Sequence, residues 1–252
     1  WNPQVGQPAI QYASYYHFNE DHAYTDVYEY LTSYSGCYNN MNTGVAFANY
    51  TAHGSNTSWS NPSFTVSDVN NLTNVGKYFL AIGNCCQAAD FGISGTCLAE
   101  AMTRAHQKAA CACIGSCPST YWYEDYYWGV GATNVYGRMP YYDETSYGVY
   151  DIMNWDTAFN VIGGIHVFGN LALCYAHDGN YGTHSSPLYY WQFYHCFGDA
   201  SIMNYCGLPT DNTVSHMAIF PIGLNTYAVT ADPGSIVAIS KDGVLHGTGV
   251  VD

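Results

Sequence analysis

Short apolar runs alternate with longer segments of helical periodicity through the middle of the chain. Residues 45–50, 78–82 and 110–115 are mostly apolar and have the length of buried strands. Helices are expected between and after them, at 67–72 with Ser67 as the cap, and at 97–108, 124–136, 156–175 and 187–197. Such alternation is typical of a mostly parallel sheet covered by helices on both faces. The pattern therefore predicts an α/β fold.

The two ends of the chain lack this alternation. Residues 1–43 are rich in tyrosine and irregular, so surface loops and short elements are expected there. Beyond Pro209, short runs at 214–220, 227–231, 236–240 and 244–250 are separated by Gly, Pro and Asp, and the Asp-Gly pair at 242–243 predicts a hairpin between the last two. We therefore predict an α/β domain over 1–207 and an all-β module over 208–252, which is too short for a complete sandwich.

The composition limits the possible partners. Of the 252 residues, 48% are hydrophobic, only 10% are charged, and the net charge is -14. Nucleic acids and anionic membrane surfaces are disfavoured, because both are bound by clusters of Lys and Arg. The longest mainly apolar run, at 161–176, is shorter than the roughly 20 residues that cross a bilayer. We expect neither nucleic-acid binding nor a membrane span.

The ten cysteines form no C-x-x-C pair. Cys111, Cys113 and Cys117 lack a histidine at zinc-finger spacing, so core packing or a disulfide is favoured over zinc. A calcium ion could be held by acidic and amide side chains near the start, although a solvated acidic loop is the simpler interpretation. Those side chains are Asn19, Glu20, Asp21 and Asp26.

Reactive side chains follow the first two predicted strands. His53 and Gly54 come after the first, and Cys85 and Cys86 after the second. If the two strands are parallel neighbours, these residues meet at the carboxyl edge of the sheet, where open α/β sheets bind ligands. A nucleophilic cysteine needs a base and N–H donors for an oxyanion, and Gly54 leaves its N–H accessible. The residues alone do not choose between the two thiols, nor between catalysis and two core cysteines beside a core histidine.

Three longer motifs carry a resemblance. Residues 49–55, 77–86 and 121–128 resemble the catalytic region of the gingipains, and especially its lysine-specific members. The similarity continues at 189–191, 198–199 and 237–245. It implies a caspase-like cysteine endopeptidase domain followed by an immunoglobulin-like module, in a secreted or cell-surface protein.

The resemblance also implies roles for single residues. Cys86 would be the nucleophile, His53 the general base, and the N–H groups of Gly54 and Cys86 the oxyanion hole. The pocket for the substrate side chain would contain Asp125, with Trp122 beside it and Thr51 nearby, and Asn84 is assigned to the same pocket. A buried carboxylate selects a cation, so the expected substrates are proteins or peptides cleaved after Lys or, less readily, Arg. The choice between the two depends on pocket depth and stays open.

Some parts of the resembling family are not in this sequence. The Asp that orients the histidine is expected just before Trp1, so an amino-terminal subdomain is an expected partner. No catalytic cofactor is expected, and Glu100 with the carbonyl of Phe91 is a candidate for structural calcium, although a helix-surface Glu is the simpler interpretation. A surface or assembly protein that keeps the fold without activity is the alternative function. The chain has only five Lys and Arg residues, which suits an enzyme that avoids cutting itself or, equally, an acidic habitat.

Overall fold

The computed structural model describes residues 2–19, 33–153, 161–177, 187–204 and 211–252. The chain divides into two compact units, Trp1–Leu208 and Pro209–Asp252. No helix within the described ranges is both long and apolar enough to cross a membrane. The nine cysteines in these ranges carry free thiols.

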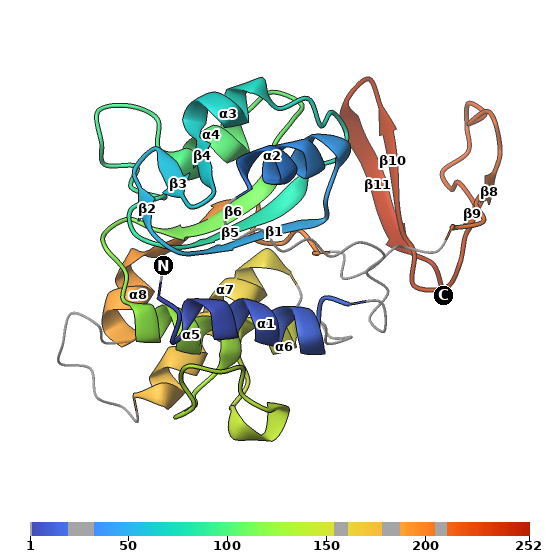
Figure 1. The fold of residues 1–252 in the computed structure, drawn as a ribbon. Helices are drawn as coiled ribbons and strands as arrows, with labels where there is room; N and C mark the ends of the chain where they lie inside the picture. The colour runs from blue at the N-terminus through green and yellow to red at the C-terminus, as the bar shows by residue number, and fades with distance from the viewer. Residues whose placement is uncertain (1, 20–32, 154–160, 178–186, 205–210) are drawn as a thin grey trace. The chain divides into compact units, whose positions relative to one another are not determined.

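A four-stranded sheet forms the centre of the first unit (Figure 1). Its order is β1 (Phe47–Thr51), β5 (Phe79–Asn84), β6 (Ala110–Ser116) and β7 (Tyr194–Gly198). The first three strands are parallel, and β7 is antiparallel to β6. The mostly parallel sheet and the predicted pairing of the first two strands are confirmed.

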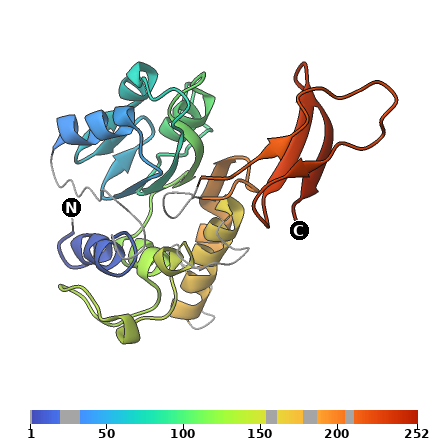
Figure 2. The ribbon, with the colours of Figure 1, turned by 90° about the vertical axis from the view of Figure 1, so that its right-hand side faces the viewer.

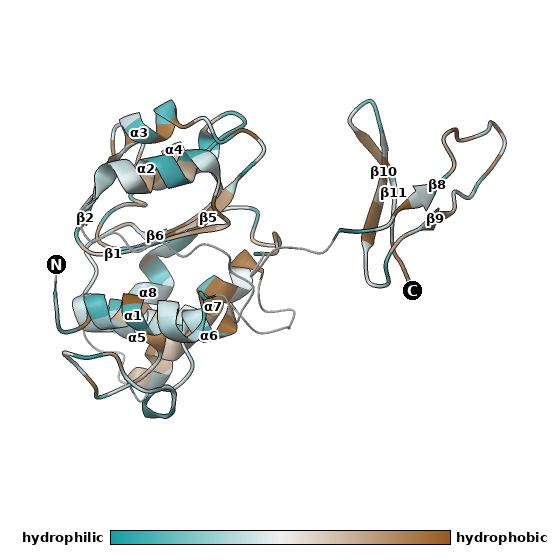
Figure 3. Cartoon of the chain, turned by 45° about the vertical axis from the view of Figure 1, so that its right-hand side comes forward, coloured by the Kyte–Doolittle hydropathy of each residue, from teal (hydrophilic) through white to brown (hydrophobic). Residues whose placement is uncertain are grey.

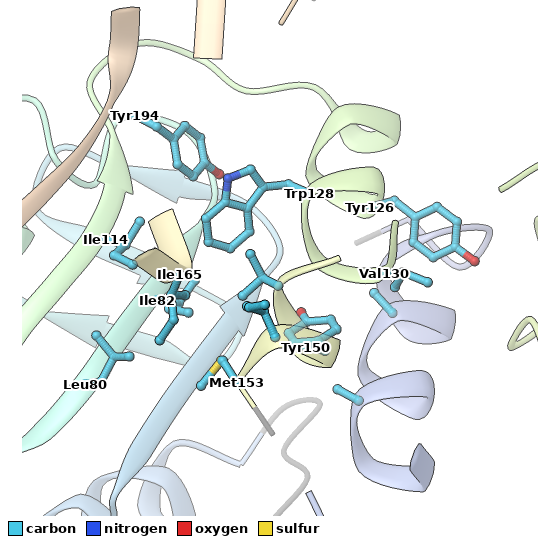
Figure 4. Close-up of a cluster of buried hydrophobic side chains, with 14 of the residues drawn as sticks. Leu80, Ile82, Ile114, Tyr126, Trp128, Val130, Tyr150, Met153, Ile165 and Tyr194 are labelled. Carbon is cyan, nitrogen blue, oxygen red and sulfur yellow. The ribbon is translucent and has the colours of Figure 1, made fainter. Parts of the chain in front are cut away.

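Helices cover both faces of this sheet (Figures 1 and 2). One face packs on α2 (Tyr34–Thr43), α3 (Val66–Asn71) and α4 (Leu98–Arg104), and the other on α1 (Gly6–Tyr16), α5 (Trp122–Val130), α6 (Val149–Ile152), α7 (Ile162–Ala176) and α8 (Pro187–Phe193). Along β5, Leu80 and Ile82 belong to one buried cluster, whereas Phe79 and Ala81 belong to the other. Successive strand residues point to opposite faces, so one apolar run fills two cores. Figure 4 shows the first cluster, where the Trp128 and Tyr194 rings lie 5.4 Å apart.

The prediction of a helix over 187–197 was wrong in its second half. The helix α8 ends at Phe193, and the next five residues form β7. These residues include Tyr, Cys and Phe, which fit a pleated surface, and β6 offers them a free edge for pairing. Long-range pairing therefore overrides a local periodicity that fits a helix.

The amino-terminal stretch is more regular than predicted. It contains α1 and α2, and α1 buries Ala9, Tyr12 and Ala13. Their spacing is helical, but alanine and tyrosine are too weakly apolar to stand out from their neighbours. Of the acidic loop proposed for calcium, Asn19 is described and donates to the carbonyl of Tyr15, whereas Glu20, Asp21 and Asp26 lie outside the described residues.

Three other predicted helices have different ends. Thr65, and not Ser67, caps α3, where it exchanges hydrogen bonds with Asp68. The helix α4 ends at Arg104 because the next residue, Ala105, takes an extended conformation with a ψ of 119°. The helix α5 ends at Val130, where Gly131 has a φ of 95°. The predicted start of the 156–175 helix lies outside the described residues.

The second unit contains two small antiparallel pairs. The strands β10 (Ile236–Lys241) and β11 (Val244–Val250) form the predicted hairpin, and Asp242 and Gly243 at its turn have φ angles of 52° and 77°. The other pair is β8 (Ser215–His216) and β9 (Val229–Thr230). Apolar positions of β10 are drawn in brown in Figure 3, and Ile236 is 74% exposed. The immunoglobulin-like assignment stays a prediction.

Candidate active site

The loops after β1 and β5 meet at the carboxyl edge of the sheet. Thr51 pairs with Asn84 at the ends of these strands, and His53 and Cys86 each follow two residues later. Gly54 lies so close to the cysteine loop that a Cβ there would stand 2.6 Å from the Cys85 Sγ and 2.7 Å from the Cys86 carbonyl oxygen. The histidine loop therefore packs directly on the cysteine loop, and only glycine fits at the contact.

Tyr50 holds the histidine loop in place. Its hydroxyl donates to the carbonyl of His53 at 2.6 Å and accepts the N–H of Ser60 at 3.0 Å. Its ring stacks on Trp59, with centroids 4.7 Å apart. Trp59 belongs to a small sheet of β2 (Gly54–Ser55), β3 (Ser58–Ser60) and β4 (Ser63–Thr65) that follows His53 directly. The imidazole itself is exposed and can meet a substrate.

The two adjacent thiols have different surroundings. Cys85 is fully buried, and this burial raises the pKa of its thiol well above the usual value, so it stays protonated. Cys86 is half-buried, and its Sγ accepts the backbone N–H of Thr120 at 3.3 Å. Cys86 is the more accessible of the two thiols and is therefore the one suited to nucleophilic chemistry.

Asp125 is a buried carboxylate in the first turn of α5, only 4% exposed. Its Oδ2 accepts from the Thr120 hydroxyl at 2.7 Å, and its Oδ1 accepts from Tyr190 at 2.9 Å. Burial raises its pKa to about 7, against the opposing effect of these hydroxyl hydrogen bonds. Asn84 fixes the backbone of the same residue, because its Nδ2 donates to the Asp125 carbonyl at 2.7 Å.

Trp122 and Thr51 lie at the same edge. The indole of Trp122 meets the His53 ring edge-on, with centroids 5.1 Å apart. A Cβ on Gly6 of α1 would stand 3.8 Å from the Thr51 carbonyl oxygen and 3.9 Å from the Trp122 ring. Trp122 thus contacts His53, Gly6 lies beside both Trp122 and Thr51, and Thr120 links Cys86 to Asp125. The catalytic and pocket roles of these residues stay predictions.

Sequence reasoning missed three hydroxyl groups of this site, those of Thr120, Tyr190 and Tyr194. Thr120 could have been predicted, because it follows β6 and so approaches the same sheet edge as His53 and Cys86. Tyr194 was not, since it lies on β7, which was predicted as helix, and Tyr190 lies on α8, whose place against this edge of the sheet no local pattern reveals.

Glu100 and Phe91, the candidate calcium ligands, have other contacts. Glu100 Oε2 accepts the N–H of Cys97 at 3.0 Å, and its Oε1 lies 3.7 Å from Arg104. The ring of Phe91 packs against His195, with centroids 5.2 Å apart. The hydrogen bond from Cys97 makes Glu100 a capping side chain at the start of α4. Within the described ranges, no group of three or more His, Cys, Asp or Glu side chains is arranged to hold a metal ion.

Several known proteins are similar to this chain in sequence. Lys-gingipain of Porphyromonas gingivalis is 51% identical in an alignment 255 residues long that covers 100% of this chain and 15% of that protein. Gingipain R2 of the same organism is 28% identical over 221 residues, covering 84% of this chain and 27% of the relative. The chain thus spans a small part of the length of these relatives.

Solved structures of peptidases have a similar fold. One described as "Structure of Protease" has a TM-score of 0.84 and 50% identity, covering 99% of this chain and 56% of that one. The Arg-specific cysteine proteinase gingipain R has a TM-score of 0.68 and 25% identity, covering 92% and 51%. Residues 4–205 match Peptidase family C25, and the chain belongs to this family.

Proposed function

We propose that the chain is the catalytic part of a secreted or cell-surface cysteine endopeptidase that cleaves peptide bonds after Lys and, less readily, after Arg. The observation that carries the proposal is the link from Cys86 through Thr120 to the buried carboxylate of Asp125. The 51% identity to Lys-gingipain supports the preference for lysine.

In the proposed reaction the Cys86 thiolate attacks the carbonyl carbon of the scissile bond. The N–H groups of Gly54 and Cys86 stabilise the negative oxygen that forms. His53 takes the proton of the thiol and gives it to the leaving amine, which produces an acyl-enzyme. Water, deprotonated by His53, then attacks the thioester and releases the acid and the thiol. The backbone N–H of Thr120 donates to the Sγ at 3.3 Å and holds the sulfur beside the pocket.

Asp125 supplies the selectivity in this proposal. A carboxylate that is 4% exposed binds a cation strongly because little water competes for it. A neutral side chain leaves the ionised carboxylate without a partner, which disfavours neutral side chains above about pH 7. Protein and peptide substrates, an amino-terminal subdomain that orients His53, and structural calcium are the proposed partners.

Labelling with a lysyl chloromethyl ketone tests the enzyme directly. We expect the full-length protein to be alkylated at Cys86 alone, as seen by peptide mass spectrometry. Cys86→Ala should abolish both labelling and turnover. Cys85→Ala is the matched control and should keep both, because the Cys85 thiol is buried and protonated.

A full-length protein that is folded but not labelled would refute the proposal. It would favour the alternative, a surface or assembly protein that keeps the fold without activity. The half-buried Cys86, with an N–H donor on its sulfur and the histidine loop packed beside it, favours the enzyme.

A further inference from the structure

The two oxygens of the Asp125 carboxylate have unequal surroundings. The hydroxyl of Tyr190 donates to Oδ1 at 2.9 Å, and the hydroxyl of Tyr194 lies 3.4 Å from the same oxygen. The neighbour of Oδ2 among the described residues is the small Thr120, at 2.7 Å. Two aromatic side chains thus lie against Oδ1, whereas one small hydroxyl group donates to Oδ2, so Oδ1 is the more covered of the two oxygens.

The two tyrosines are fixed where they stand. Tyr190 is 0% exposed and Tyr194 is 2% exposed, and their rings stack with centroids 5.1 Å apart. The Tyr190 hydroxyl also accepts the N–H of Tyr121 at 3.0 Å, and the Tyr194 hydroxyl donates to the side-chain oxygen of Asn84. Moving either ring would leave buried polar groups without partners, which is costly. The cover on Oδ1 is thus a permanent part of the site.

The less covered oxygen, Oδ2, is the one connected to the nucleophile. Thr120 donates its hydroxyl to Asp125 Oδ2 and its backbone N–H to Cys86 Sγ. One residue therefore spans from the reacting sulfur to this oxygen. A substrate side chain that enters the pocket beside Cys86 reaches Oδ2 before Oδ1.

The two basic side chains place different demands on a carboxylate. An ammonium is a compact charge that one acceptor position satisfies, whereas a guanidinium binds best through two parallel N–H bonds, one to each oxygen. We propose that Tyr190 and Tyr194 are specificity-determining residues: they cover Oδ1 of Asp125 and leave Oδ2 as the less covered acceptor, which suits lysine and denies arginine its second bond. This inference deepens the proposed function and rests on it.

Tyr190→Phe tests the inference. The variant keeps the ring and removes the hydroxyl that occupies Oδ1. We expect the ratio of kcat/KM for a Lys substrate to that for the matched Arg substrate to fall about tenfold, the equivalent of one hydrogen bond of about 1.4 kcal/mol. Tyr189→Phe is the matched control, because its hydroxyl donates to the Ser119 carbonyl at 2.9 Å on the exposed side. The control should keep the wild-type ratio.

Tyr194→Phe is the second variant, for the case that Tyr190→Phe does not fold. It removes the other hydroxyl near Oδ1, so the ratio should again shift toward arginine. Circular dichroism and thermal unfolding establish that each variant is folded. Folded variants with the wild-type ratio would overturn the inference.

A measurement without turnover separates this inference from the proposed function. Iodoacetamide alkylation of Cys86 in the full-length protein is followed with n-butylammonium or n-butylguanidinium as the protecting cation. We expect butylammonium to protect at the lower concentration in the wild type, and Tyr190→Phe to reduce or reverse this order. Protection in this order by a protein that cleaves no peptide would refute the proposed function and support the inference. Cleavage after Lys together with equal protection by both cations would support the proposed function and refute the inference.

Discussion

Asp125 is a charged side chain in surroundings that disfavour its charge. Burial raises its pKa to about 7, and the hydroxyls of Thr120 and Tyr190 oppose this by donating to the ionised form. A substrate cation lowers the pKa again, because an opposite charge nearby favours the carboxylate. For folding, a raised pKa favours the protonated form, so this contribution to stability is present below the ordinary pKa of 3.8 and is lost as the pH rises through about 7.

The selectivity for a basic side chain should therefore depend on pH. Above about pH 7 the Asp125 carboxylate is charged and attracts lysine, and below it the pocket is neutral. We expect the ratio of kcat/KM for a Lys substrate to that for the isosteric, uncharged norleucine substrate to fall as the pH is lowered from 8.5 to 5.5. The ratio isolates the pocket, because His53 acts on both substrates alike. Asp125→Asn should give a low ratio at every pH, and a wild-type ratio that does not change with pH would contradict the assignment.

Single residues also show where sequence reasoning stops. The residue types alone do not distinguish Cys85 from Cys86, whereas the structure separates them by burial and by the N–H that Thr120 donates to Cys86. Thr120 acts through its backbone N–H as well as its hydroxyl, and no residue type reveals a backbone donor. Asp125 stood out by resemblance and not by pattern, since a carboxylate inside an aromatic helix has no periodic signal.

Among the elements, strands with a local apolar pattern were predicted correctly, whereas a strand that depends on long-range pairing was missed. The strands β5 and β6 are apolar runs that are buried on both faces, so composition alone reveals them, whereas β1 is a mixed run in which Phe47 and Asn49 are half-buried. The strand β7 is half-buried and exists through its pairing with β6, which no local pattern encodes. Because Tyr194 lies on β7, the missed strand is also the reason why Tyr194 was not predicted to lie near Asp125.

The backbone after the lysines bears on self-cleavage. Of the three lysines, Lys108 and Lys241 are followed by residues in the left-handed region, Ala109 and Asp242, with φ angles of 61° and 52°. A peptidase binds the bond that it cuts in an extended backbone conformation. A non-glycine residue seldom takes the left-handed conformation unless the fold imposes it, so these two bonds are held away from the extended form. We infer that the folded protein resists cleavage at two of its three lysines.

Limited proteolysis with a lysine-specific protease tests this resistance. The hairpin turn at Lys241 should be cut slowly in the wild type and faster in Gly243→Ala, because a Cβ strains the φ of 77° at residue 243 and opens the turn. Gly249→Ala is the matched control, since nothing lies within 4 Å of a Cβ there and its φ is ordinary. Rapid cutting after Lys241 in the folded wild type would contradict the inference.

The charge of the whole molecule favours basic substrates before they reach the pocket. The net charge is -14, and four of the five basic side chains have partners within the fold. Lys77 donates to the Thr43 carbonyl and Lys108 to that of Asn70, whereas Arg138 and Arg104 pair with Glu144 and Glu100. The field around the chain is thus negative because 19 acidic residues outnumber five basic ones, and such a field raises the association rate of cationic ligands.

Salt should therefore lower kcat/KM for lysine substrates more than for neutral ones. The Debye length falls from about 10 Å at 0.1 M to about 3 Å at 1 M ionic strength, which removes long-range attraction but leaves contacts inside the buried pocket largely unscreened. We expect kcat/KM for a Lys substrate to fall severalfold between about 0.05 and 0.5 M NaCl, with most of the change in the association rate. The norleucine substrate is the control and should change little. Equal salt dependence for both substrates would assign the selectivity to Asp125 and its hydroxyl neighbours alone, without a contribution from the charge of the molecule.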